Sequence, residues 1–330
     1  LRDGTNPTAP QAITWVAGFN GSPNPTRIAR YWLYKFTNLT PVYANWEQIN
    51  ENTVLKSGQA YTMKGNGIVS APNILLQNYV FTGKPNNGLI NNTGIQIGIN
   101  NINLTGNPYP SALDANEFIN DNLNAITGTL YFWEHYNTNS SHTTVQYQGG
   151  YATYTNTGGT APVAPTGVSG LGTSSKTPKR YIPVGQGFFV KGSATGGNII
   201  FKNSQRTFVK ENASTSYTLF RSMNNSTEEN DTEEPEESFM KIRLGYDSAN
   251  QYHRESLIGF MNQYASENFD AGYDGISLET LSNDMYFILG SHNLNIMGEG
   301  YFNPNRIYPI GVKNAIAGNV KFSIGELENV

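Results

Sequence analysis

The residues from 103 to 122 constrain the fold of this chain more than any other stretch. They include Pro108 and Pro110. Each proline fixes its own φ angle and pushes the preceding residue out of the helical region. Residues 107–110 are therefore predicted to form an extended, rigid corner, and a short helix is predicted to follow it.

The start of that helix is indicated by a capping pattern. Ser111 and Asp114 have the S-x-x-D spacing of a capping box, in which the serine oxygen accepts a backbone hydrogen bond and the carboxylate reaches back to the cap residue. We predict a helix over residues 112–119 that buries Leu113 and Phe118. Ordinary domains often contain such a corner, so the pattern predicts fold rather than chemistry.

Strands are predicted wherever short aromatic and β-branched runs lie between Pro, Gly and Asn clusters. The clearest is 128–136, where Leu130, Phe132, Glu134 and Tyr136 alternate with side chains of the opposite face. Further strands are predicted at 12–20, 30–37, 59–64, 78–82, 95–104, 239–246, 255–261, 285–290, 308–313 and 320–327. In 30–37 an almost wholly aromatic face is predicted to be core.

Three segments complete the prediction of the fold. Residues 149–179 are rich in Gly, Thr, Ser and Pro and are predicted as a long exposed loop, with only a brief strand at 151–155. Residues 181–191 and 198–208 are predicted to pair as a hairpin. The acidic run 224–237 has no apolar residue to bury and is predicted as a solvated linker.

Composition supports an all-β protein. Gly (34), Tyr (20) and Phe (16) are plentiful, and charged residues make up only 14%. A chain of 330 residues is long enough for two domains. We therefore predict two antiparallel β-sandwich or jelly-roll-like domains, 1–222 and 238–330, joined by an acidic linker or loop at 223–237, with one short helix near 112–119.

Charge and hydropathy exclude several classes of function. A net charge of −4 with 21 basic residues leaves no basic stripe for phosphates, so no nucleic-acid partner is expected. No apolar run is long enough for a transmembrane segment. The absence of cysteine excludes disulfides, thiolate nucleophiles and Cys-ligated metals. The chain opens without a secretory signal, and we expect it to be a mature or excised piece.

Four segments carry a resemblance to a known family. Residues 106–115, Gly-Asn-Pro-Tyr-Pro-Ser-Ala-Leu-Asp-Ala, resemble a stretch found in large secreted surface proteins of Bacteroidota, just upstream of a type IX secretion sorting domain. Residues 55–65, 79–88 and 181–190 resemble three further segments of that family, and the four recur together there.

The resemblance implies an extracellular location on the bacterial cell surface. It implies export by the type IX secretion machinery and outer-membrane anchoring through a C-terminal domain that would begin about where this sequence stops. Members of the family include gliding-motility adhesins and long surface fibres. Surface attachment, gliding or filament building is therefore the expected role.

Residues 270–275 offer a candidate calcium site. Asp270 and Asp274 lie four residues apart in a Gly-rich turn, and Asp284 could complete a shell of hard oxygen ligands. The full EF-hand spacing is absent. Because Asp and Gly are also the default turn residues, an ordinary turn is the alternative. Neither interpretation requires a cofactor, and calcium is the one candidate for a bound ion.

Ser248 is a candidate glycosylation site. The tripeptide Asp247-Ser248-Ala249 matches the Asp-Ser/Thr-apolar pattern at which Bacteroidota attach O-glycans to exported proteins. The resemblance to their surface proteins therefore implies that Ser248 is a candidate for an O-glycan. The alternative is an ordinary turn after the strand 239–246. Both interpretations can hold together, since a glycan needs an exposed turn.

Aromatic residues near the predicted long loop are candidates for sugar binding. Pyranose rings stack on aromatic planes, and Tyr147, Tyr151 and Tyr154 are the tyrosines that core packing explains least easily, with Tyr109 and Trp133 as further candidates. The alternative is that these rings are β-core or cross-strand pairs.

No sequence motif supports catalysis. Glu134 and His135 are adjacent on a predicted strand and so point to opposite faces. No nucleophile elbow, zinc-protease helix or phosphate-binding loop is present.

We predict a non-enzymatic stalk or adhesin segment, with polysaccharide or other surface proteins as partners. The alternative is a carbohydrate-binding module of a secreted polysaccharide-degrading enzyme. A third possibility, catalysis, would need carboxylates from distant strands to converge across a cleft.

Overall fold

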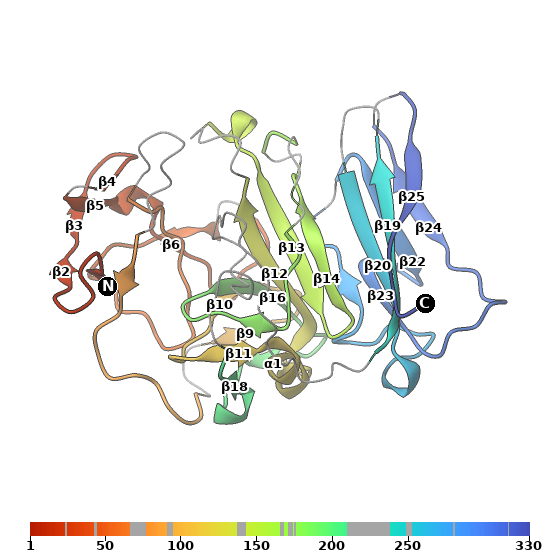
Figure 1. Ribbon diagram of the computed structural model, residues 1–330, viewed down its shortest axis with the longest axis horizontal. Helices are drawn as coiled ribbons and strands as arrows, with labels where there is room; N and C mark the ends of the chain where they lie inside the picture. The colour runs from red at the N-terminus through yellow and green to blue at the C-terminus, as the bar shows by residue number, and fades with distance from the viewer. Residues whose placement is uncertain are drawn as a thin grey trace.

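The computed structural model confirms the all-β class (Figure 1). The structure describes residues 1–23, 25–42, 45–66, 77–90, 95–136, 143–165, 168–170, 174, 176–209, 238–248, 253–279, 281–315 and 317–330. The predicted linker 223–237 lies outside the described residues, so the predicted domain boundary stays a prediction. None of the helices in the described part of the chain has the length and apolar character that crossing a membrane requires.

The elements before the acidic run are short apart from those of a central sheet. They are β1 (Arg2–Asp3), β2 (Gln11–Ala12), β3 (Thr14–Val16), β4 (Ser22–Pro23), β5 (Thr26–Ala29), η1 (Arg30–Trp32), β6 (Tyr34–Lys35), β7 (Glu47–Gln48), β8 (Tyr79–Val80), β9 (Gln96–Ile97), β10 (Ile102–Gly106), β11 (Ala112–Asp114), α1 (Ala115–Asn122), β12 (Ile126–His135), η3 (Thr144–Gln146), β13 (Gly149–Thr155), β14 (Gly158–Val163), β15 (Tyr181–Ile182), β16 (Gly187–Gly192), β17 (Gly197–Asn198), η4 (Asn203–Gln205) and β18 (Arg206–Thr207).

The elements after the acidic run build one larger sheet. They are β19 (Met240–Asp247), β20 (His253–Phe260), η5 (Asn262–Tyr264), β21 (Gly275–Ile276), β22 (Asp284–Leu289), β23 (His292–Glu299), β24 (Ile310–Lys313) and β25 (Lys321–Glu328). Figure 1 shows this sheet, in cyan and blue, beside the central sheet, with the red N-terminal strands on the other side.

The central sheet has the strand order β10-β16-β12-β13-β14, and its printed pairings are antiparallel. Helix α1 packs on one face of it, where Phe118 contacts Phe188 at a ring-centroid distance of 5.4 Å. The predicted alternation is confirmed, because Leu130 and Phe132 are 0% and 2% exposed in this core.

The helix begins one turn later than predicted. Residues 112–114 form β11, which pairs with β15 and β18, so their backbone is committed to a sheet. Asp114 is the N-cap instead: its Oδ1 accepts from the backbone N–H of Asn116 at 3.0 Å and of Glu117 at 3.4 Å. The predicted burial of Leu113 and Phe118 is confirmed, since both are 0% exposed.

Three other local predictions are wrong in whole or in part. The brief strand predicted at 151–155 lies within β13, but residues 149–163 as a whole are a hairpin of β13 and β14 in the central sheet rather than part of an exposed loop. Strands β15 to β18 pair with β11, β10, β12 and β9 and do not pair with one another as a hairpin. Residues 30–37 are a 3-10 turn followed by the short strand β6, although Leu33 and Phe36 are buried.

The C-terminal sheet has the order β24-β22-β23-β20-β19-β25, with β21 also paired to β23. It packs on a core that includes Ile258, Phe260, Phe287 and Met297. Strands β20 and β23 run parallel, as do β3 and β5, so the sheets are mixed rather than wholly antiparallel. Strand β23 was not predicted.

Candidate binding cleft between the two sheets

Hydrogen bonds to a turn that precedes and includes β21 hold the two sheets together. The backbone carbonyl of Tyr273 accepts from the hydroxyl groups of Thr155 at 3.0 Å and Thr157 at 2.8 Å. The Tyr131 hydroxyl donates to the carbonyl of Ile276 at 2.9 Å. Buried threonine and tyrosine hydroxyls of the central sheet thus satisfy backbone groups of the C-terminal part.

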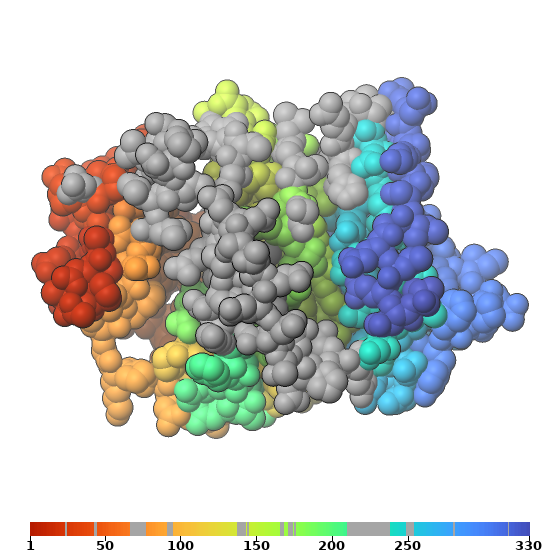
Figure 2. All heavy atoms as spheres, viewed as in Figure 1, coloured from red at the N-terminus to blue at the C-terminus, as the bar shows by residue number. Residues whose placement is uncertain are grey.

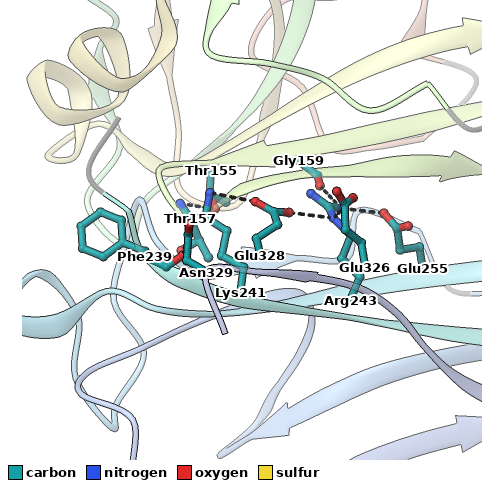
Figure 3. Close-up of polar contacts among 10 residues, drawn as sticks. All are labelled: Thr155, Thr157, Gly159, Phe239, Lys241, Arg243, Glu255, Glu326, Glu328 and Asn329. Atoms are coloured by element: carbon teal, nitrogen blue, oxygen red, sulfur yellow. Dashed lines mark hydrogen bonds and ion pairs between the residues drawn. The ribbon is translucent and has the colours of Figure 1, made fainter. Parts of the chain in front are cut away.

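Arg243 provides a second set of contacts between the two sheets (Figure 3). Its guanidinium donates to the Gly159 carbonyl of β14 at 2.9 Å and pairs with Glu255 at 2.7 Å and Glu328 at 3.1 Å. Its side chain is 13% exposed. Several charge-assisted bonds to one buried guanidinium orient β14, β20 and β25 relative to one another.

Apolar side chains also cross the junction. Val163 of β14 shares a buried cluster with Tyr246, Leu281 and Met285 from the C-terminal part. The two segments predicted as separate domains therefore share this small buried cluster, in addition to the larger cluster that each part has of its own. Their relative placement is set by packing as well as by hydrogen bonds.

A cleft of about 620 Å³ lies beside this junction. Its lining comes from both parts of the chain: Ile99, Asn100, Thr127, Lys191, Gly192 and Ala194 on one side, and Phe269, Ile276, Ser277, Glu279, Asp284, Ser291, His292, Asn293 and Lys313 on the other. This volume is in the range of small-molecule sites, which occur preferentially between structural units.

Charged groups of both signs line the cleft. Burial raises the pKa of Glu279 to about 7, although the nearby Arg254 opposes the shift. Asp284 also has a raised pKa from burial, again opposed by Arg254, whose Nε lies 2.8 Å from its Oδ1. Arg254 further donates to Asn295 at 2.7 Å. A paired, buried guanidinium thus supports the carboxyl side of the cleft.

The cleft also has aromatic and amide surfaces. The ring of His292 lies 4.5 Å from that of Phe269, between centroids, at an interplanar angle of 31°. Asn100 and Asn293 bring side-chain amides from the two sides, and Lys191 and Lys313 bring ammonium groups. Such a lining can bind a polar ligand through flat ring faces, bidentate amides and charges.

The predicted calcium ligands are not gathered in one place. Asp274 accepts from the backbone N–H of Gly298 at 2.8 Å and of Asp270 at 2.7 Å. Asp270 accepts from the backbone N–H of Ser266, while Asp284 pairs with Arg254. In the described part of the chain, no three His, Cys, Asp or Glu side chains are grouped so as to hold a metal ion.

The structure brings two of the three predicted sugar-binding tyrosines together and buries the third in the core. Tyr154 is 5% exposed in the core under α1 and donates to Asn116 at 2.8 Å. Tyr147 stacks on Trp133 at a centroid distance of 5.9 Å, and Tyr151 meets the edge of the same ring at 4.8 Å. Tyr147 and Tyr151 are thus brought together around Trp133, and Tyr154 is not.

The remaining candidates are also placed by the sheets. Ser248 follows β19 and is 8% exposed, so its hydroxyl is buried in this conformation. Glu134 is 2% exposed and pairs with Lys176 at 3.1 Å. His135, its neighbour on β12, stacks on Tyr147. The two adjacent side chains have separate partners, as the alternation of a strand requires.

Sequence reasoning missed the cleft. Its residues come from six or more short segments that are distant in the chain, such as the turn at Asn100, the end of β16 at Lys191 and the end of β24 at Lys313. None of these segments carries a motif of its own. The raised pKa values of Glu279 and Asp284 depend on their burial and on the nearby Arg254, and neither can be read from the local sequence.

Comparisons with known proteins give a family and no activity. No curated protein matches the chain. No solved structure matches it either. A family model described as "Domain of unknown function (DUF8693)" matches residues 14–330, which is nearly the whole chain. The chain therefore belongs to the DUF8693 family.

Proposed function

We propose that this chain is a non-enzymatic structural and adhesive segment of a cell-surface protein exported by the type IX secretion system. Its resemblance to the surface-protein family in four segments supports the export route and the extracellular location. The observation that carries the structural role is the way in which those four segments pack together.

The four segments meet around the corner at Asn107. Asn107 donates through Nδ2 to the carbonyls of Ile182 at 3.3 Å and Pro183 at 3.2 Å, and its Oδ1 accepts from Tyr109 N at 3.0 Å. The Tyr109 hydroxyl donates to the Gly88 carbonyl at 2.7 Å. These bonds join residues 106–115 to the segments 181–190 and 79–88.

The fourth segment joins through the preceding strand. The Thr105 hydroxyl donates to the Gly58 carbonyl at 2.5 Å, and Ala60 N donates to Leu104 O at 3.3 Å. The polar groups that carry the resemblance are therefore used inside the fold, where buried polar groups need partners. This supports a role in which the segments build a framework and a ligand binds elsewhere.

The junction supports the same role. A stalk must transmit load between its parts, and the bonds from Arg243 and from the Thr155 and Thr157 hydroxyls couple the two sheets across several strands. The cleft beside the junction is the surface that we assign to adhesion, because asparagine, lysine and aromatic residues from both parts of the chain line it.

Adhesion is tested with beads that carry the purified chain. We expect such beads to stay bound under flow on polysaccharide-coated surfaces, and Lys191→Ala to lower their retention at least about tenfold, because Lys191 is one of the two lysines that line the cleft. The matched control is Lys84→Ala, which changes an exposed lysine outside the cleft. Retention equal to that of beads coated with an inert protein would contradict adhesion.

A carbohydrate-binding module is the second candidate function. The adjacent, tilted rings of His292 and Phe269 and the amide of Asn293 favour it, since sugar hydroxyls pair with amides and pyranose faces with rings. A glycan array is the test: we expect binding that Asn293→Ala abolishes. Binding that is lost in Tyr151→Ala and kept in Asn293→Ala would show that the sugar binds at the Trp133 cluster instead. An array with no bound glycan would reject this function.

Calcium binding and glycosylation of Ser248 stay proposals. If Asp270 and Asp274 hold calcium, chelator lowers the melting temperature and their joint replacement by Ala abolishes the difference; an unchanged melting curve would reject the site. Intact mass and peptide mapping of the native protein test the glycan. Because Ser248 is buried, its modification would have to precede folding or open the end of β19.

A further inference from the structure

Strand β25 forms one edge of the C-terminal sheet and exposes apolar side chains. It pairs with β19 on one side and ends the strand order of the described part of that sheet. Phe322, Ile324 and Leu327 are 54%, 69% and 52% exposed. Figure 2 shows the darkest blue segment at the surface of the molecule. A long edge strand with exposed apolar residues is a template for pairing with another strand.

The strand is held firmly in its own sheet. Glu328 pairs with Arg243 at 3.1 Å and with Lys241 at 3.7 Å, and the Asn329 amide donates to Phe239 O at 3.0 Å (Figure 3). These contacts fix the register of β25 on β19. Its outer edge is therefore a preformed strand, and pairing there does not first have to order it.

A bulge in β25 changes which residues share a face. The register shifts between Leu244, opposite Ile324, and Ile242, opposite Leu327. Phe322 lies opposite Tyr246, on the same face as Leu244 and Ile242. Residues five apart in a regular strand point to opposite faces, but the bulge places Phe322 and Leu327 on one face.

We propose that β25 pairs with β25 of a second copy of this chain, antiparallel and about a two-fold axis. The register that sets Phe322 opposite Leu327 of the second copy also sets Lys321 opposite Glu328. Each of these pairs occurs twice, because a two-fold interface repeats every contact. Apolar residues meet apolar ones and opposite charges meet, which is the complementarity that cross-strand pairs require.

The same strand is thus self-complementary, and this is the observation that selects a second copy as the partner. Gly325 lies near the two-fold axis, where it adds no side chain that could block the approach. Ile324 of each copy flanks the axis. The interface goes beyond the proposed function, since it assigns an assembly to a face that lies outside the cleft.

The first test is sedimentation velocity of the purified chain from about 1 to 100 μM. We expect a concentration-dependent dimer, and we expect Ile324→Lys to make the chain monomeric, because an edge charge opposes strand pairing. The matched control is Ile307→Lys, at an apolar side chain that is 86% exposed outside the strands and should leave the dimer intact. Circular dichroism of each variant is the check that it is folded.

The second test examines the register. The chain has no cysteine, so single cysteines report defined contacts. Mixing Phe322→Cys with Leu327→Cys under mild oxidation should give a disulfide dimer, because opposite residues are within the required Cα distance. Each variant alone should stay uncrosslinked, since with the bulge equal residues would lie four strand positions, or about 14 Å, apart. A monomer at 100 μM, a dimer unaffected by Ile324→Lys, or cross-linking of either variant alone would overturn the proposal.

Discussion

At the scale of single residues, Asp114 connects a strand to a helix. Its carboxylate caps α1 and also forms a bidentate pair with Arg180, at 3.0 Å from Nε and 2.8 Å from Nη2. Ser111, the predicted cap, instead accepts from Arg206 at 3.2 Å. The helix start is thus decided by Asp114, the last residue of β11, because its carboxylate accepts from two backbone N–H groups.

The replacement Asp114→Ala should lower the free energy of unfolding by about 2–3 kcal/mol, because the cap and the Arg180 pair are lost together. Ser111→Ala should cost less than about 1 kcal/mol, since only one hydrogen bond is lost. Urea denaturation of both variants is the measurement. Equal losses would show that Ser111 contributes to the cap after all.

Asp274 should make stability depend on pH. It is 0% exposed, and burial raises its pKa from 3.8 to about 7, although the backbone bonds from Asp270 and Gly298 oppose the shift. The folded chain therefore holds a proton that the unfolded chain releases above about pH 4. The stabilisation from this group is complete below pH 4 and is lost as the pH rises through about 7.

We expect the free energy of unfolding to fall by on the order of 2–3 kcal/mol between pH 5 and pH 8 from this group alone. Asp274→Asn should remove that part of the difference, whatever its effect at a single pH. Denaturant titrations at the two pH values measure it. A pH difference of the same size in the variant would exclude Asp274 as the titrating group.

At the scale of elements, β12 and the turn before β21 approach each other closely. Gly128 has a φ of +82°, and a Cβ there would lie 2.4 Å from the backbone of Gly272. The N–H of Gly272 donates to Thr127 O at 3.2 Å in the same contact. Only glycine allows the two backbones to meet at this distance.

Replacement of Gly128 by Ala should therefore destabilise the chain by about 3 kcal/mol or more, through the clash and the positive φ together. Gly18→Ala is the matched control. Gly18 has a φ of +89° with no atom within 4 Å of an added Cβ, so it isolates the backbone strain of about 1 kcal/mol. Thermal melts of the two variants separate the two causes, and similar melting temperatures would mean that the turn moves aside.

At the scale of the whole molecule, the shared junction should make unfolding cooperative. The buried cluster of Val163 with Tyr246, Leu281 and Met285 lies between the two sheets, and Arg243 donates across the junction to Gly159 O. We expect the two sheets of the wild-type chain to unfold in one calorimetric transition. Neither sheet alone buries the apolar cluster at the junction.

Arg243→Met should split that transition into two, because Glu255 and Glu328 lose their common partner and the tie to β14 disappears. Arg306→Met is the control. It removes ion pairs with Glu299 and Glu267 inside the C-terminal part and should lower the melting temperature without splitting the transition. Two transitions in the wild type would show that the sheets unfold independently.

Local patterns in the sequence were sufficient for the class of the fold and for several elements. The alternation around Leu130 and Phe132 predicts β12 because a strand's faces are set by neighbouring residues alone. The presence of a helix after Pro110 follows from local backbone preferences in the same way. The resemblance to a surface-protein family also rests on short contiguous segments.

Only the tertiary structure decided which strands pair and where a cleft forms. Composition predicted only 151–155 as a strand within a loop, yet residues 149–163 form both β13 and β14, and at Gly150, where a Cβ would lie 2.1 Å from the Val163 carbonyl oxygen, the two strands approach closely. The cleft joins Lys191 to Glu279, which are far apart in sequence. Pairing and clefts depend on such distant partners, whereas periodicity depends on near neighbours, and a single sequence records only the latter directly.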